Sequence, residues 1–128
     1  SPCQNTQDAN TNMMIKQLKN KIRHGLQPDN PALLSIWLNF EESTCKSFNQ
    51  KKQFKAYIAM VKFLMECYAD TMNPPHWRAT CLDHMARPLS CLQRICYGPV
   101  QHTELQALYM EINVLSHYFS PNFIPQNN

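Results

Sequence analysis

The 128-residue chain has only two glycines, Gly25 and Gly98, and this scarcity bears on its fold class. A β-sandwich or β-barrel of this length needs more glycines in its turns, so both architectures are disfavoured. No apolar run approaches the ~20 residues of a transmembrane helix, so we expect no membrane insertion. The sequence also lacks an Asn-x-Ser/Thr sequon, a nucleotide-binding loop and a catalytic motif. We therefore expect no enzymatic activity and no cofactor.

Cysteine, in contrast, is abundant. An even number of cysteines without a C-x-x-C pair is typical of disulfides in a secreted protein. The chain begins with Ser1 and not with Met, which agrees with a mature secreted chain. The sequence does not choose among the possible pairings, except that two cysteines five residues apart on one short helix point in different directions. The expected disulfide cysteines are Cys3, Cys45, Cys67, Cys81, Cys91 and Cys96.

A zinc site is the alternative use of some of these cysteines. Cys81, His84, Cys91 and Cys96 are residue types that bind zinc. Their spacing matches none of the usual zinc-binding patterns, and Pro88 lies between the two halves. We expect disulfide cysteines near a surface histidine and no bound metal.

The segment 50–71 contains neither glycine nor proline, and its apolar residues recur with helical spacing. Phe54, Ile58, Val61, Leu64 and Tyr68 follow the i, i+3, i+4, i+7 pattern, and further apolar residues widen this sector beyond half of the circumference. A helix this apolar needs cover on several sides, because each buried side chain of this size contributes roughly 1.5–3 kcal/mol. The pattern predicts the central helix of an all-α domain.

The remaining elements are predicted from periodicity and from helix-ending residues. We expect one domain over 1–128, with irregular tails at 1–10 and 120–128. A first helix runs over about 11–24 and ends at Gly25; a second runs over about 31–45, with Asn30 as its N-cap. Pro88 divides the segment 76–96 into two short helices, and the last helix runs over about 103–119.

Two groups of basic residues are candidate contacts for an acidic partner. Such ridges are usually solvated faces; the functional alternative is a patch for an acidic receptor or for sulfated glycans. Aromatic residues are not interleaved with the lysines, so nucleic acid is not expected as a partner. The candidate residues are Lys16, Lys19 and Arg23 on the first helix, and Lys51, Lys52 and Lys55 on the central helix.

The last helix has two apolar strips. Leu105, Leu108 and Ile112 belong to the strip suited to the core. The second strip contains Met110, Val114 and Tyr118, together with Ala107. We expect it to pack against the short helix at 88–96; the alternative is an exposed partner surface, because large exposed apolar patches mark interaction sites.

Taken together, these features predict a disulfide-stapled four-helix bundle with extra short helices. In architecture it resembles the short-chain helical cytokines, which are small secreted bundles with disulfides. The resemblance implies a secreted ligand, cytokine-like or growth-factor-like, that signals by binding a cell-surface receptor in the extracellular space. We expect a monomer or a homodimer, the latter through the second strip of the last helix.

Two alternatives remain open. One is a secreted carrier of a small apolar ligand, such as the six-cysteine odorant-binding proteins and elicitins, although neither cysteine spacing fits this chain. Its cavity would be lined by Phe54, Tyr57, Val61, Leu64, Leu108 and Ile112. The other is an inhibitor or virulence factor that blocks a host protein with the same surfaces.

Overall fold

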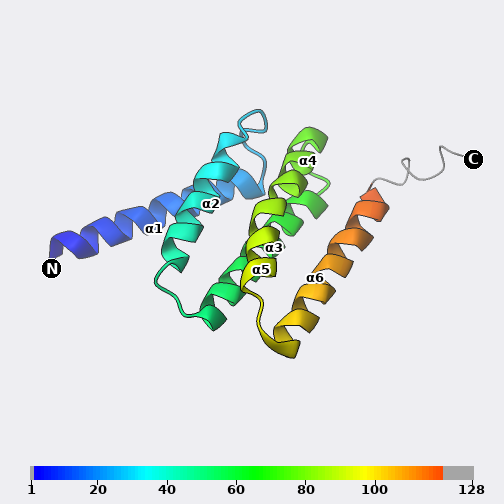
Figure 1. Ribbon diagram of the computed structural model, residues 1–128. Helices are drawn as coiled ribbons and strands as arrows, with labels where there is room; N and C mark the ends of the chain where they lie inside the picture. Colours follow the sequence, from blue (N-terminus) through cyan, green and yellow to red (C-terminus); the bar gives the residue numbers. More distant parts are fainter. Residues whose placement is uncertain (1, 120–128) are drawn as a thin grey trace, which may run out of the picture.

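The computed structural model describes the backbone of residues 2–119 and the side chains from Ala9 onwards (Figure 1). This part of the chain is all-α, as the sequence predicts, and contains no strand. None of the helices within it is long and apolar enough to cross a membrane. The helices are α1 (Pro2–Arg23), α2 (Ala32–Cys45), α3 (Gln50–Ala69), α4 (Pro75–His84), α5 (Ala86–Ile95) and α6 (Gly98–Phe119).

Helix α3 lies at the centre of the fold and contacts each of the other helices. It begins where Asn49 accepts a hydrogen bond from the backbone N–H of Lys52 at 2.9 Å, which satisfies one free donor of the first turn. Val61, Leu64 and Cys67 on α3 have no exposed surface. The prediction of a central helix that begins at residue 50 is therefore confirmed.

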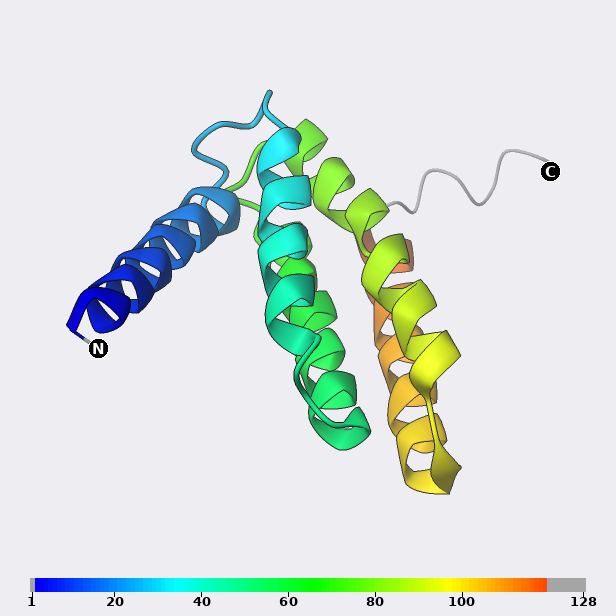
Figure 2. The same ribbon diagram turned by 60° about the vertical axis from the view of Figure 1, so that its left-hand side comes forward.

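Helices α3 and α6 run side by side in the same direction, and α4 and α5 return the chain between them (Figures 1 and 2). At one end the Gln50 side chain donates to Gln101 Oε1 at 2.7 Å. At the other end the rings of Tyr68 and Phe119 meet edge to face, 5.4 Å apart. In each pair the two residues are 51 positions apart in the sequence. The two parallel helices therefore have the same alignment at both ends.

The division between the two short helices falls at Met85 and not at Pro88. Pro88 lies in the first turn of α5. Backbone N–H groups in a first turn have no intrahelical partner, so a proline there breaks no helical hydrogen bond. Pro88 is buried in the core. The expected pair of short helices is present, but the sequence placed their boundary three residues too late.

Helices α1 and α6 are longer than expected. Residues 2–10, predicted as an irregular tail, form the start of α1, and α6 begins at Gly98 and not near residue 103. Gly98 has a φ of 82°, a conformation that favours glycine, and it separates α5 from α6. Asn30, the expected N-cap of α2, donates to the Gln27 side chain, and Pro31 occupies the cap position. The expected tail at 120–128 lies outside the described residues.

The disulfides expected from the sequence are not supported here. Five cysteines are present as thiols, and the side chain of Cys3 lies outside the described region. The free thiols are those of Cys45, Cys67, Cys81, Cys91 and Cys96. All five are buried or half-buried, so they contribute to the core as apolar side chains.

Candidate functional site

The outward face of α6 is an exposed apolar surface. Met110, Val114 and Tyr118 are 66%, 68% and 75% exposed, whereas Leu105 and Leu108 on the opposite face of the same helix are buried. We call the first three residues the α6 strip. The strip was expected to pack against the helix at 88–96, and this prediction is wrong.

The position of α5 explains this difference. Helix α5 packs mainly on α3, with Cys91 and Leu92 buried there. Helix α5 contacts α6 through the Gln93 amide, which donates to the Tyr109 hydroxyl at 2.6 Å. No helix in the described part of the chain lies over the α6 strip, because α6 packs chiefly against α3.

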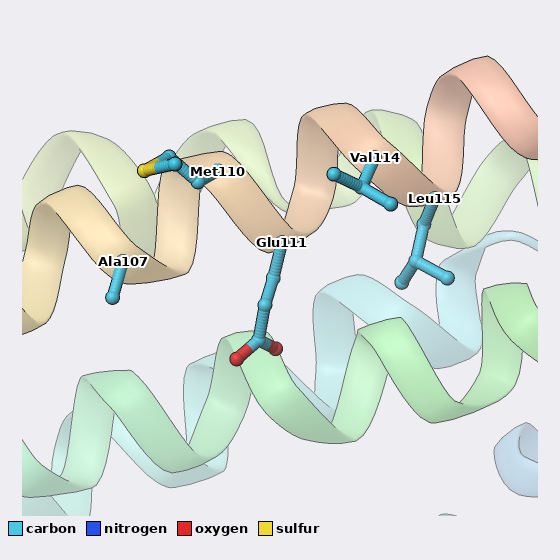
Figure 3. Close-up of a pocket in the computed structure, with 5 residues that line it drawn as sticks. All are labelled: Ala107, Met110, Glu111, Val114 and Leu115. Carbon is cyan, nitrogen blue, oxygen red and sulfur yellow. The ribbon is translucent and has the colours of Figure 1, made fainter.

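A groove of about 500 Å³ runs along α6 beside the strip. Figure 3 shows its lining: Glu111 and Leu115 point towards α3, while Ala107, Met110 and Val114 lie along α6. The lining is mostly apolar, with the Glu111 carboxylate as its one charged group. The groove offers an apolar anchor site with a charge at its edge, a combination typical of protein-binding surfaces.

A second groove of about 510 Å³ opens between the first turns of α3 and α6. Phe54 lines it from the core, Lys51 and Lys55 from α3, and Val100 and Glu104 from α6. The exposed Tyr97 lies at the same end. Sequence analysis missed Tyr97 and Val100, because the expected start of the last helix near residue 103 left both in a connecting segment. Their apolar character was the only available signal.

The predicted basic residues fall into two groups in the structure. Lys51, Lys52 and Lys55 are exposed on α3, and Lys51 and Lys55 line the second groove. The Lys52 ammonium also lies 4.2 Å from the centre of the Phe48 ring. Lys51 and Lys55 therefore share a groove with Tyr97 and Val100, whereas none of the residues of the α6 strip lines it.

The ridge on α1 is engaged within the protein. Arg23 donates to Asp70 at 2.6 Å, and its guanidinium holds the pKa of the Asp70 carboxyl below its ordinary value. The Lys19 ammonium lies 4.7 Å from the centre of the Phe63 ring. Only Lys16 of this ridge is exposed and lacks such a contact in the described region. The structure does not bring the α1 ridge to the α6 strip.

The residues considered for a zinc site or for a ligand cavity have other surroundings. Across the side chains described, no group of three or more histidines, cysteines and carboxylates is placed to hold a metal ion. His84 forms a 2.8 Å hydrogen bond with the backbone oxygen of Thr80. Of the residues expected to line a carrier cavity, Phe54, Val61, Leu64 and Leu108 are buried in the core cluster, and Tyr57 and Ile112 pack against it.

Tyr57 is half-buried, and the pKa of its hydroxyl is strongly raised. Burial and a hydrogen bond with Cys91 raise its pKa to about 12. At neutral pH the hydroxyl is therefore a proton-bearing structural group. It shows no feature of a general base, because a base needs a pKa near the working pH.

Among the described residues, the surfaces open to a partner are the α6 strip and the two grooves. Comparison of the chain with protein-family models, with curated proteins and with solved structures finds no match.

Proposed function

We propose that this protein is a secreted, disulfide-stapled helical ligand that binds a cell-surface receptor through the α6 strip, the groove beside it and the second groove at the first turns of α3 and α6. The observation behind the proposal is that Met110, Val114 and Tyr118 are exposed together on a helix whose opposite face is in the core. Monomeric proteins rarely expose contiguous apolar surface without a use for it. A helix face with anchors at i, i+4 and i+8 is also a recurrent mode of protein recognition.

The residues have distinct roles in this proposal. Tyr118 and Met110 are the anchors, because aromatic residues and methionine are enriched at the energetic centre of interfaces. Lys51 and Lys55 steer the encounter with an acidic receptor surface, since rim charges affect the association rate more than the affinity. The same lysines are the candidate contacts for a sulfated glycan.

The test is binding of the labelled full-length protein to cell surfaces. We expect saturable binding, and we expect the double variant Met110→Ser, Tyr118→Ser to lose at least tenfold in affinity. The matched control is Met72→Ser, which changes an 89% exposed methionine that lies in the turn after α3 and is not part of the α6 strip. Equal binding by the double variant and the wild type would contradict the proposed surface, and absence of saturable binding would contradict a receptor ligand.

A carrier of a small apolar ligand is a second candidate, favoured by the volume and apolar lining of the groove on α6. Native mass spectrometry of the secreted protein distinguishes the two. A bound mass that is lost on denaturation supports the carrier, whereas the mass of the chain alone supports the receptor ligand.

A further inference from the structure

Cys67 on α3 and Cys81 on α4 are neighbours in the core. Neither side chain has any exposed surface. The neighbouring Cys67 side chain and burial raise the pKa of the Cys81 thiol. The two helices that carry these cysteines, α3 and α4, pack together. A disulfide requires the two Cα atoms to lie within about 7 Å of each other.

The backbone around this pair is held by polar contacts. The Arg78 guanidinium on α4 donates through Nε to the backbone oxygen of Tyr68 at 2.7 Å. The Asn73 amide, in the turn between the helices, donates to the backbone oxygen of Cys67 at 3.0 Å. Helix α4 follows α3 after a short turn, and both contacts lie between the cysteine pair and this turn. They fix how the two helices meet close to Cys67 and Cys81.

A second pair is placed by different contacts. The Gln53 amide on α3 donates to the backbone oxygen of Cys45 at 3.0 Å. One turn further along α3, burial and the neighbouring Cys91 raise the pKa of Tyr57. Cys45 on α2 and Cys91 on α5 therefore face successive turns of the same helix. One turn before the two cysteines, Arg87 on α5 donates to Glu42 on α2 at 3.1 Å and links the same two helices.

We propose that Cys67 pairs with Cys81 and Cys45 with Cys91 as disulfides, so that one bond fastens α4 to α3 and the other fastens α5 to α2. This inference rests on the secreted location in the proposed function, because disulfides persist in oxidising compartments. The pairs also use cysteines from helices that the α6 strip does not touch. The cross-links thus hold the scaffold and leave the binding face unchanged.

The oxidant in this proposal is a disulfide of a protein or of a small molecule. The thiolate of one cysteine attacks a sulfur of this disulfide, which forms a mixed disulfide and releases a thiolate of the oxidant. The thiolate of the second cysteine then attacks the mixed disulfide, which forms the intramolecular S–S bond. The oxidant leaves as two thiols that take up the two protons lost by the cysteines.

Burial determines when this reaction takes place. The hydrogen bond from Cys67 and the burial of the thiol raise the pKa of Cys81, and burial raises the pKa of Cys45. In the folded protein both groups are protonated and inaccessible, whereas the thiolate is the reactive form. The bonds form during folding, and after folding they resist exchange with added thiols.

The experiment is disulfide mapping of the full-length protein recovered from secreting cells. The protein is denatured at mildly acidic pH with an alkylating agent and then digested with trypsin and Asp-N, without reduction. Cleavage after Lys and Arg and before Asp places each cysteine in a peptide of its own. The peptides are 1–7, 29–46, 63–69, 79–82, 83–94 and 95–128, in the order of the cysteines along the chain.

The expected result is a linked species of 63–69 with 79–82 and another of 29–46 with 83–94, each separated into its two peptides by reduction. Linkage of 63–69 to 83–94, or of 29–46 to 79–82, overturns the pairing and leaves the secreted location intact. Recovery of all four peptides as alkylated free thiols overturns the pairing and the oxidising compartment together. Receptor binding by the α6 strip is measured separately on the same preparation, so its failure is distinguishable from either outcome.

A second measurement tests the pairing through single variants. In Cys81→Ala the partner Cys67 is expected to become a free thiol that is alkylated after denaturation, while Cys45 and Cys91 stay linked. In Cys91→Ala the free thiol is expected at Cys45. A free thiol at any other position in the secreted variant contradicts the proposed pairs.

Discussion

At the scale of single residues, the junction of α1, α3 and α4 depends on a few polar side chains. The last turn of α1 leaves backbone oxygens without helical partners. The Asn73 amide donates to the backbone oxygen of Arg23 at 3.0 Å, and the Trp77 indole donates to that of Ile22 at 2.9 Å. Gly25, with a φ of 56°, lets the chain turn there, where a Cβ would lie 3.1 Å from Trp77.

The first prediction concerns Asn73, which is 3% exposed and donates to two backbone oxygens from different helices. Asn73→Ala leaves both buried oxygens unpaired, so we expect the free energy of unfolding to fall by about 1–3 kcal/mol. Urea denaturation followed by circular dichroism measures the change. Asn30→Ala is the control, because Asn30 is exposed and its side-chain amide donates only to the Gln27 side chain. Equal stabilities of the two variants would contradict this role of Asn73.

The second prediction concerns the pH dependence that Asp70 contributes. Its hydrogen bond with Arg23 lowers its pKa from the ordinary 3.8. A lowered pKa means that the folded state prefers the charged carboxylate, so this stabilisation is full above about pH 4 and is lost as the pH falls through the lowered pKa. We therefore expect Asp70→Asn to be less stable than the wild type at pH 6, with a smaller difference at pH 2. A difference that does not depend on pH would refute this role.

At the scale of elements, α6 has two apolar faces in different surroundings. Leu108 is 2% exposed against α3, whereas Met110 faces solvent two residues later. Burial of one face holds the helix on the scaffold, and the other face remains available to a partner. The same helix thus serves stability and binding through different side chains.

The third prediction compares these faces. Leu108→Ala is expected to lower the free energy of unfolding by about 2–5 kcal/mol, the range for buried leucines. Met110→Ala is expected to change it by less than about 0.5 kcal/mol, because surface substitutions are usually near neutral. Differential scanning calorimetry of both variants, with the wild type as reference, measures the shifts in melting temperature. A large loss of stability in Met110→Ala would mean that the strip is covered in solution.

The oligomeric state of the protein tests whether the α6 strip binds a second copy of the chain. If the α6 strip binds a receptor and not a second copy of the chain, light scattering gives the mass of one chain, 14.9 kDa. The double variant Met110→Ser, Tyr118→Ser then gives the same mass. A wild-type dimer that dissociates in the variant would assign the strip to a homodimer.

At the scale of the whole molecule, α3 connects the other helices. Each of them contacts α3, and the fully buried Val61, Leu64 and Cys67 lie along it. The N-terminal half of α1 is the opposite case: it projects away from the other helices (Figure 2), and residues 9–14 are exposed. Local stability should therefore fall from α3 outwards.

The fourth prediction is a gradient of amide hydrogen exchange. Amides in the middle of α3 are expected to exchange only through global unfolding, because opening α3 exposes the whole core. Amides near residues 9–14 are expected to exchange fastest among the helical residues from Ala9 to Phe119, because few buried contacts hold that turn. Exchange of native protein followed by mass spectrometry measures both. Similar rates in the two segments would show that α1 is held by contacts that this structure lacks.

The sequence by itself determined the helical character of the chain and the limits of its central element. The absence of glycine and proline from 50 to 71, the wide apolar sector and the following Pro74 predicted a helix at 50–71. The observed α3, Gln50–Ala69, begins at the predicted residue and ends two residues earlier. These are local properties: propensity and chain-terminating residues act within a few positions. For the same reason the division of 76–96 into two short helices was predictable to within a few residues.

Only the tertiary structure decided which apolar faces are covered. On α6 the core strip and the α6 strip have similar apolar character, and the packing of α6 on α3 buries one and exposes the other. Likewise, the sequence marked Arg23 as a candidate contact, and its pairing with Asp70 follows from how α1 meets the end of α3. The proximity of Cys67 to Cys81 also depends on the α3–α4 hairpin. Periodicity shows that a face is apolar but not which neighbour covers it, because that depends on contacts between residues far apart in the chain.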